Sequence, residues 1–237
     1  MTGLVRLAFA AFFFFYFSYI GLMSPYASLY FASRDFGAIE IAALMSMFQI
    51  TRILGPFAWG WLADIRRDRL GIMRVTSVMA CIIFSAIFYL ESYLPLLIWM
   101  FLLNTVISSL MPLGEAATVH ALYKNNDFDR RYGRLRLWGS IGFIAMVLFA
   151  GAWFERFGIE SFPYFGMVAL LIMTVLTTTL REPAMEATHH VEIKLGHVLK
   201  NTQVQWFMSA NFWMIFGHAA LYVFYSLYLD RLGYSKG

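Results

Sequence analysis

The 237-residue sequence is 60% hydrophobic and only 14% charged, whereas soluble domains carry roughly 25% charged residues. Its net charge of +4 does not indicate a nucleic-acid partner, because the charged residues lie in short segments between long apolar runs. The single cysteine, Cys81, excludes an internal disulfide and a cysteine-ligated metal site. The composition therefore predicts an all-α integral membrane protein that lies within the lipid bilayer.

Seven apolar runs are long enough to cross about 30 Å of hydrocarbon, which takes about 20 helical residues. The first run, residues 7–31, is too long for a signal peptide and is not followed by a clear cleavage site. We therefore interpret it as the first membrane span. The other six spans are predicted at about 39–63, 72–91, 95–122, 135–154, 162–181 and 203–229.

The lysines and arginines near the predicted spans are distributed unevenly between the two sides of the membrane. Cytoplasmic loops carry the excess of these residues. The side of the N-terminus has Arg6, Arg66, Arg67, Arg69, Arg74, Lys124, Arg130, Arg131, Arg134, Arg136, Arg181, Lys194 and Lys200. The other side has Arg34, Arg156, Arg231 and Lys236. The sequence therefore predicts a multi-pass protein of the cell membrane, inner or plasma, with a cytoplasmic N-terminus.

Two predicted helices end in similar sequences, Ser28-Leu29-Tyr30-Phe31 and Ser226-Leu227-Tyr228-Leu229, which lie 198 residues apart. The offset contains six spans, so both copies point in the same direction across the membrane. Parallel six-helix repeats are the organisation of major facilitator transporters. We therefore predict a six-helix transmembrane bundle at 1–181, a cytoplasmic linker at 182–202 and the first helix of a second bundle at 203–237. Five further helices would complete a twelve-helix protein, which we expect to be a monomer.

Two charged residues lie inside consecutive apolar runs. Glu115 follows Pro112 in the fourth run, and Arg136 enters the fifth run from a charged turn. A charge at the bilayer centre costs about 2.5–3.5 kcal/mol on insertion scales, so it usually faces a partner or a cavity. An arginine and a carboxylate on neighbouring helices can form a charge-assisted pair. We therefore predict a solute or proton site at Glu115 and Arg136; a structural salt bridge and an arginine that reaches the headgroups are the alternatives.

Other polar residues within the spans are further candidates. Arg52 lies near the middle of the second span, where it could bind a substrate anion or brace a helix. His218 in the seventh span could carry protons or only pack. Among the aromatic residues of the first span, Tyr16, Tyr19 and Tyr26 are the candidates for a cavity wall. The histidines of the linker lack the regular spacing of metal ligands, so no metal site is predicted.

The loop after the second span reads Gly60-Trp61-Leu62-Ala63-Asp64-Ile65-Arg66 and continues with further basic residues. It resembles the signature loop of the major facilitator superfamily, Gly-x-Leu-Ala-Asp followed by a basic cluster. Gly60 is expected to let its helix approach a neighbour closely, and Asp64 to accept hydrogen bonds at the start of another helix. Arg67 stands where the family usually has glycine. The resemblance implies a gating role for Gly60, Asp64 and Arg66.

Within the superfamily, the whole chain resembles the lactose permease and phenylpropionate permease group. The resemblance rests on the aromatic run 13–19 with Pro25 and on the motif at 132–136. Segments 52–55 and 217–220 look most like the phenylpropionate branch. The resemblance implies the major facilitator fold and proton-coupled symport, with the proton gradient as the energy source and no cofactor.

The resemblance also implies roles for single residues. Arg136 and Glu115 match the sugar-binding pair of lactose permease, and Glu115 is the residue we expect to bind the proton. Phe143 stands seven residues after Arg136, where lactose permease has a tryptophan that stacks on the sugar. The acidic residues of the seventh helix are absent, and Asn211 and His218 are found there instead. These differences weaken the case for a galactoside, and the arginines within the spans and the resemblance to the phenylpropionate branch favour a carboxylate.

We therefore predict a proton symporter of an aromatic or aliphatic carboxylate, such as phenylpropionate, that works by alternating access. A sugar (oligosaccharide) or a nucleoside is the alternative solute. A seven-helix receptor fits the number of spans, but not the cytoplasmic N-terminus, the repeat or the signature loop. A membrane enzyme would need a catalytic cluster, and the sequence contains none that we recognise.

Overall fold

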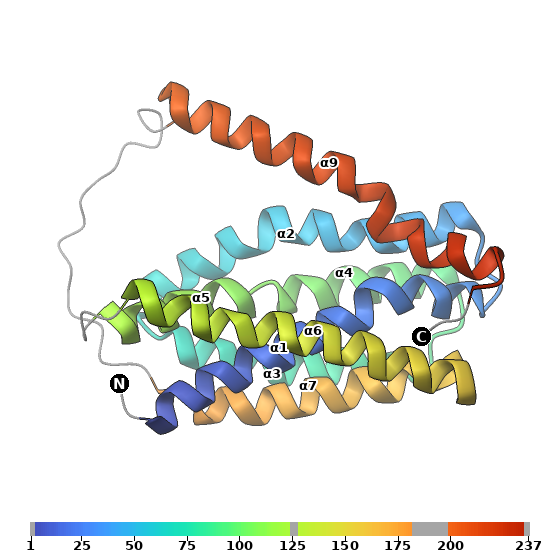
Figure 1. The fold of residues 1–237 in the computed structure, drawn as a ribbon, viewed down its shortest axis with the longest axis horizontal. Helices are drawn as coiled ribbons and strands as arrows, with labels where there is room; N and C mark the ends of the chain where they lie inside the picture. Colours follow the sequence, from blue (N-terminus) through green and yellow to red (C-terminus); the bar gives the residue numbers. More distant parts are fainter. Residues whose placement is uncertain (1–2, 124–127, 182–198, 235–237) are drawn as a thin grey trace.

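The computed structural model describes residues 3–123, 128–181 and 199–234 (Figure 1). Within these ranges the chain consists of helices and short turns, with no β-strand. The helices are α1 (Gly3–Ala32), α2 (Ala38–Arg66), α3 (Arg69–Ser85), α4 (Tyr93–Ile107), α5 (Leu110–Tyr123), α6 (Phe128–Phe157), α7 (Phe162–Thr179) and α9 (Thr202–Arg231), with 3₁₀ turns η1 (Ala86–Phe88) and η2 (Ile159–Ser161).

Six segments within the described residues are long and apolar enough to cross a membrane. They match the first six predicted spans in chain order, which confirms the prediction of an all-α membrane protein. α9 covers the seventh predicted span, but several of its side chains lie outside the described residues, so its membrane crossing stays a prediction. The domain boundaries also stay a prediction, and most of the linker at 182–202 lies outside the described residues.

The sequence predicts a single helix at 95–122, whereas the structure contains two, α4 and α5. The interruption includes Ser108, whose hydroxyl donates a hydrogen bond to the Thr105 carbonyl oxygen over 2.7 Å. Hydroxyls that bond to the preceding turn often bend helices. Pro112 then lacks the N–H group that would bond to the Ser108 carbonyl. These two features account for the break, which the apolar pattern alone does not reveal.

α1 is the central helix, and it packs against α6, α7 and α9. Its contact with α6 is close because glycines stand where the backbones meet. A Cβ atom on Gly21 would lie 2.7 Å from the Phe143 carbonyl oxygen, and one on Gly142 would overlap the Phe14 backbone. Small residues allow membrane helices to approach in this way. The first half of α6 is therefore held against the aromatic residues of α1.

Polar side chains connect the outer helices. The indole N–H of Trp59 in α2 donates to the Thr105 carbonyl oxygen in α4 over 2.7 Å. In the contact of α3 with α7, the Arg74 guanidinium donates to the carbonyl oxygens of Thr177 and Leu180, at 3.4 and 3.3 Å. A cation is favoured at this C-terminal end of a helix. These hydrogen bonds connect α2 to α4, and α3 to the C-terminal end of α7.

Candidate functional site

The structure places Arg136 beside Glu115, across the contact of α6 with α5. Arg136 Nε lies 3.5 Å from Glu115 Oε1, and the two side chains are 36% and 38% exposed. The Tyr132 hydroxyl also interacts with the Glu115 carboxylate. Tyr132 and Arg136 are four residues apart, so both lie on the same face of α6. This face of α6 presents the Arg136 guanidinium and the Tyr132 hydroxyl to the Glu115 carboxylate.

The Arg136 guanidinium also lies over an aromatic ring of α1. Its central carbon is 4.1 Å from the centroid of the Phe17 ring and 6.0 Å from that of Phe13. At these distances the cation is attracted to the negative face of the ring. Arg136 is therefore held from two sides, by the Glu115 carboxylate and by the Phe17 ring.

A cavity of about 240 Å³ lies between α1, α2 and α6. Arg52 is the basic residue in its wall, and the described residues that line it include no aspartate or glutamate. Arg52 forms no hydrogen bond or ion pair with any residue that the structure describes. The lining residues are Phe17, Ile20, Met23, Ser24, Met45, Phe48, Gln49, Arg52 and Phe143. We call this space the Arg52 cavity.

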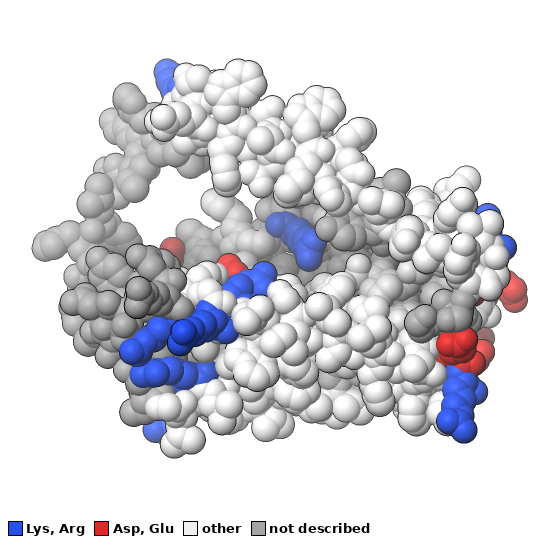
Figure 2. All heavy atoms as spheres, in the orientation of Figure 1, with Lys and Arg blue, Asp and Glu red and all other residues white. Residues whose placement is uncertain are grey.

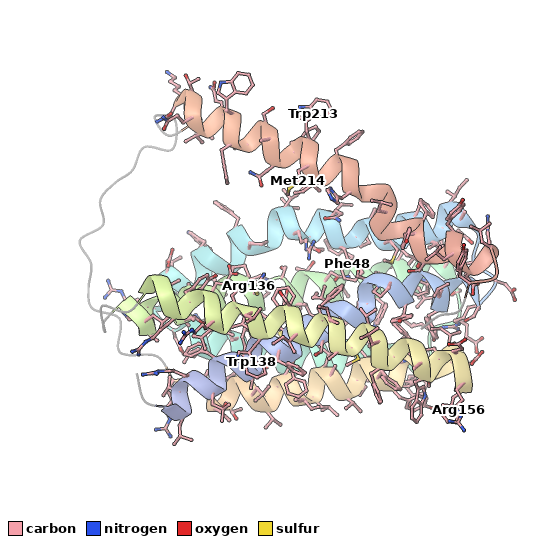
Figure 3. All side chains as sticks on the ribbon, viewed as in Figure 1. Phe48, Arg136, Trp138, Arg156, Trp213 and Met214 are labelled. Carbon is pink, nitrogen blue, oxygen red and sulfur yellow. The ribbon has the colours of Figure 1, made fainter. Side chains whose placement is uncertain are left out.

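Arg136 and Glu115 are not among the lining residues of the Arg52 cavity, although the sequence predicts one joint site. Phe17 belongs to both groups, because it lines the cavity and contacts Arg136. Tyr16, buried beside Phe17, is within electrostatic reach of Arg52, Glu115 and Arg136. Figure 3 labels Arg136, which belongs to α6, and Phe48, which belongs to α2.

A second cavity, of about 320 Å³, lies between α1, α6 and α9. Ser24 and Phe143 border both cavities, so the two spaces are neighbours. Tyr26 lines the second cavity, and its hydroxyl donates to the Val147 carbonyl oxygen of α6 over 2.7 Å. Asp230 of α9 is in the same wall. The predicted site residues Phe143 and Tyr26 are therefore both cavity residues.

Two other predicted site residues lie elsewhere. The Tyr19 side chain is completely buried and lines neither cavity, and its hydroxyl has no hydrogen-bond partner among the described residues. His218 of α9 also lines neither cavity, and its Nδ1 lies 2.7 Å from the Met214 carbonyl oxygen. Tyr19 is thus packed in the core, and its predicted role at the cavity wall stays a prediction.

The loop between α2 and α3 differs from its expected geometry. A Cβ atom on Gly60 would meet nothing within 4 Å, so Gly60 is not a point of close helix approach here. On α2 that point is Gly55, where a Cβ atom would overlap the Ser108 hydroxyl. Asp64 is exposed, and the start of α3 is capped by Asp68 instead, whose Oδ1 accepts from the Gly71 N–H over 2.8 Å.

Two further residues complete this loop. Arg67 adopts a left-handed backbone conformation, with φ of 51°, which explains physically why glycine suits this position in the family. Arg66 lines a further cavity, of about 290 Å³, with Asp68 and Trp59. The gating role of Gly60, Asp64 and Arg66 stays a prediction.

Sequence reasoning did not assign Phe17, Phe48 or Tyr132 to the site. Phe17 belongs to a run of aromatic residues at 12–17, and such a run does not indicate which ring meets a charge. Gln49 could have been predicted from the sequence, because it stands three residues before Arg52 and therefore lies on the same helix face; it lines the cavity. Tyr132 could have been predicted in the same way, because it stands four residues before Arg136 on one helix face.

The outer surface shows where basic side chains gather and where the molecule is hollowed. On the face shown in Figure 2, basic side chains gather at the end of the molecule where α6 begins. The surface is hollowed between α9 and the rest of the bundle, and a basic group lies at the bottom of that hollow.

Two curated relatives are transporters. A maltose permease of Geobacillus stearothermophilus is 29% identical over 185 residues, which cover 77% of this chain and 46% of the permease. The uncharacterized transporter YwbF of Bacillus subtilis (strain 168) is 25% identical over 228 residues, which cover 94% of this chain and 56% of YwbF. The chain thus spans about half the length of these relatives. Both relatives are described as transporters, not as enzymes.

Solved structures show the same fold. The nucleoside transporter NupG superimposes with a TM-score of 0.72 at 17% identity, over 87% of this chain and 53% of NupG. A mutant of NupG gives a TM-score of 0.74 over 86% and 52%. At this identity the likeness concerns the fold alone. A family model described as the MFS_1 like family matches residues 6–237. The chain therefore belongs to the MFS_1 like family of major facilitator proteins.

Proposed function

We propose that the protein is a proton-coupled secondary transporter that moves a small aromatic or aliphatic carboxylate across the cell membrane by alternating access. Family membership and the six membrane-length helical segments support transport. The observation that carries the substrate class is the position of Arg52, which lies in an aromatic-lined cavity without a carboxylate partner among the described residues.

The charge of Arg52 favours an anionic solute. An arginine at membrane depth faces a cavity or a partner, because its charge is expensive to place in hydrocarbon. A guanidinium presents donors in a planar fork that matches the two oxygens of a carboxylate. Since the described residues of the cavity wall include no acid, a carboxylate on the solute would supply one. Gln49, which shares the cavity wall, offers a second donor.

The size and lining of the cavity favour a ring. An engineered cavity of about 150 Å³ holds benzene, and the Arg52 cavity is larger, at about 240 Å³. Phe17, Phe48 and Phe143 surround it, and aromatic rings prefer stacked or edge-to-face contacts with one another. A single-ring acid with a short side chain combines both properties, as phenylpropionate does.

We assign proton binding to Glu115. It is a membrane-depth acid in contact with a base and with the Tyr132 hydroxyl, and about a third of its side chain is exposed, so protons can reach it. Solute binding and proton binding would thus occur at two groups, Arg52 and Glu115, that are both within electrostatic reach of Tyr16. The proton gradient supplies the energy, and no cofactor is needed.

The same proposal includes the arrangement in the membrane. We infer a cytoplasmic N-terminus, which the basic side chains at one end of the molecule support (Figure 2). The bundle at 1–181 would form one half of the transporter, and α9 would begin the other half. The functional unit would be a monomer that contacts the solute, the proton and the lipid bilayer.

The test is uptake of labelled phenylpropionate by proteoliposomes that contain the full-length gene product, with and without an inward proton gradient. The expected result is accumulation that requires the gradient and is competed by other aromatic carboxylates. Uptake of a neutral sugar or a nucleoside, with no competition by phenylpropionate, would overturn the carboxylate assignment.

A sugar is the second candidate, and the similarity to a maltose permease favours it. The rings of Phe17, Phe48 and Phe143 could pack on a sugar face, with Gln49 and Ser24 as hydrogen-bonding groups. Maltose therefore belongs in the same uptake panel. In that case Arg52 would serve as a hydrogen-bond donor to hydroxyl groups and its charge would not be needed.

A further inference from the structure

We propose that Phe17 couples solute binding in the Arg52 cavity to the Arg136–Glu115 ion pair, and that Gly139 positions Phe17 for this task. The inference rests on the proposed function and deepens it. Neither residue belongs to the predicted site, and both are identified by their contacts in the tertiary structure.

Phe17 has two contacts of different kinds. Its side chain lines the Arg52 cavity, so a solute in that cavity touches it. Its ring also lies under the Arg136 guanidinium, 4.1 Å from centroid to central carbon. Arg136 in turn is 3.5 Å from Glu115. The Phe17 ring therefore contacts both the space for the solute and the arginine of the ion pair.

Gly139 is the reason that this stack can form. It follows Arg136 by one helical turn, on the face of α6 that meets α1. A Cβ atom on Gly139 would lie 2.6 Å from Phe17 Cδ2 and 3.0 Å from Arg136 Nη1. Both groups would have to move to admit even a methyl group. The Phe17 ring and the Arg136 guanidinium therefore occupy the space that a side chain at position 139 would need.

The contact of the Arg136 guanidinium with the Phe17 ring is sensitive to small movements, because it depends on the distance and orientation of the ring. A cation is attracted only to the face of a ring, within about 6 Å of its centroid. A solute that turns or shifts the Phe17 ring changes how firmly Arg136 is held, and Arg136 then holds Glu115 differently. Coupling between two sites is reciprocal. The state of the ion pair therefore also affects the cavity wall.

A purely structural Phe17 makes a different prediction. If the ring only fills space, leucine should replace it with little effect on coupling, and tyrosine should have no special advantage. If the ring face is needed, tyrosine should preserve the function and leucine should not. Phe15 provides the matched control, because it is also partly exposed on α1, lines neither cavity and contacts the Phe14 ring at 5.1 Å.

The experiment uses proteoliposomes with the full-length gene product and labelled phenylpropionate. The variants are Phe17→Leu, Phe17→Tyr, Gly139→Ala and the control Phe15→Leu. Each is measured in solute exchange without a gradient, which reports binding and reorientation, and in accumulation driven by a proton gradient. The amount of inserted protein is determined for every variant, so that activities refer to folded protein.

Phe17→Leu and Gly139→Ala are expected to lower gradient-driven accumulation roughly 3- to 30-fold, the range that corresponds to a cation–π contact. The half-saturation of exchange should stay within about threefold in Gly139→Ala, because Gly139 does not line the cavity, and it should rise in Phe17→Leu, because the solute touches the Phe17 ring. Phe17→Tyr should restore coupling, and Phe15→Leu should behave as the parent does. The inference is overturned if Phe17→Leu accumulates the solute as Phe15→Leu does, if exchange and accumulation fall together in Gly139→Ala, or if tyrosine at position 17 restores nothing. If Phe17→Leu does not insert, Gly139→Ala and Phe17→Tyr decide the question.

Failure of the proposed function has a separate signature. A parent protein that takes up no phenylpropionate contradicts the proposed function, and this inference falls with it. A parent protein that accumulates phenylpropionate while Phe17→Leu stays fully coupled removes this inference alone.

Discussion

The Ser18 hydroxyl of α1 donates a hydrogen bond to the Gly142 carbonyl oxygen of α6 over 3.1 Å. The next residue in α6, Phe143, and the preceding residue in α1, Phe17, both line the Arg52 cavity. This interhelical contact therefore fixes the distance between two walls of the cavity. Much of the site depends on how closely α1 and α6 approach.

The first prediction concerns this approach. A Cβ atom on Gly142 would overlap the Phe14 backbone, which cannot turn aside as a side chain can. Gly142→Ala should therefore lower the stability of the protein by about 1–3 kcal/mol, as overpacking does. Gly133→Ala is the control, because a Cβ atom there meets nothing within 4 Å; it should be neutral or stabilising by up to about 1 kcal/mol. Thermal unfolding in detergent measures both, and equal melting temperatures would contradict the prediction.

The second prediction concerns the start of α3. Asp68 accepts a hydrogen bond from the Gly71 N–H over 2.8 Å, whereas exposed Asp64 has no such bond. Asp68→Ala should therefore cost about 0.5–2 kcal/mol, the usual loss for an N-cap. Asp64→Ala should leave the unfolding temperature nearly unchanged. If Asp64→Ala lowered the unfolding temperature more than Asp68→Ala, the prediction would be wrong, and Asp64 would stabilise the fold through a contact that this structure does not show.

The third prediction tests the role of Arg52. Arg52→Gln removes the charge but keeps a donor, so the apparent affinity for phenylpropionate should fall about 10- to 150-fold, the range for a hydrogen bond between charged groups. Uptake kinetics give this value. Arg34→Gln serves as the control, because Arg34 lies over the Tyr30 ring and lines neither cavity. An unchanged affinity in Arg52→Gln would favour a neutral solute.

The fourth prediction separates transport from proton coupling. Glu115→Gln cannot bind and release a proton, so it should lose gradient-driven accumulation and retain solute exchange. Exposed Glu91, in the turn before α4, provides the control substitution Glu91→Gln, which should accumulate the solute as the parent does. The measurements are the accumulation ratio and the exchange rate in the same proteoliposomes. Full accumulation by Glu115→Gln would place the proton site elsewhere.

Several features could be predicted from the sequence because each depends on local residue patterns. Long apolar runs interrupted by short basic loops predict membrane helices, and six of the predicted spans have helices of the required length and hydropathy. Glu115 and Arg136 could be singled out because charges are rare within such runs. The break between α4 and α5 was less accessible, since the serines and the proline that cause it are individually tolerated in membrane helices.

What the sequence by itself determined is therefore the class of the protein, the order of its helices and the identity of its membrane-depth charges. Only the tertiary structure decided which groups meet. It placed Arg52 in the wall of a cavity and the Arg136 guanidinium over the Phe17 ring, and it buried Tyr19 in the core. The physical reason is that α1 is apolar on every side, so its sequence does not indicate which face meets α6. The close contacts at Gly21, Gly139 and Gly142 set that rotation, and they exist only once the helices have packed.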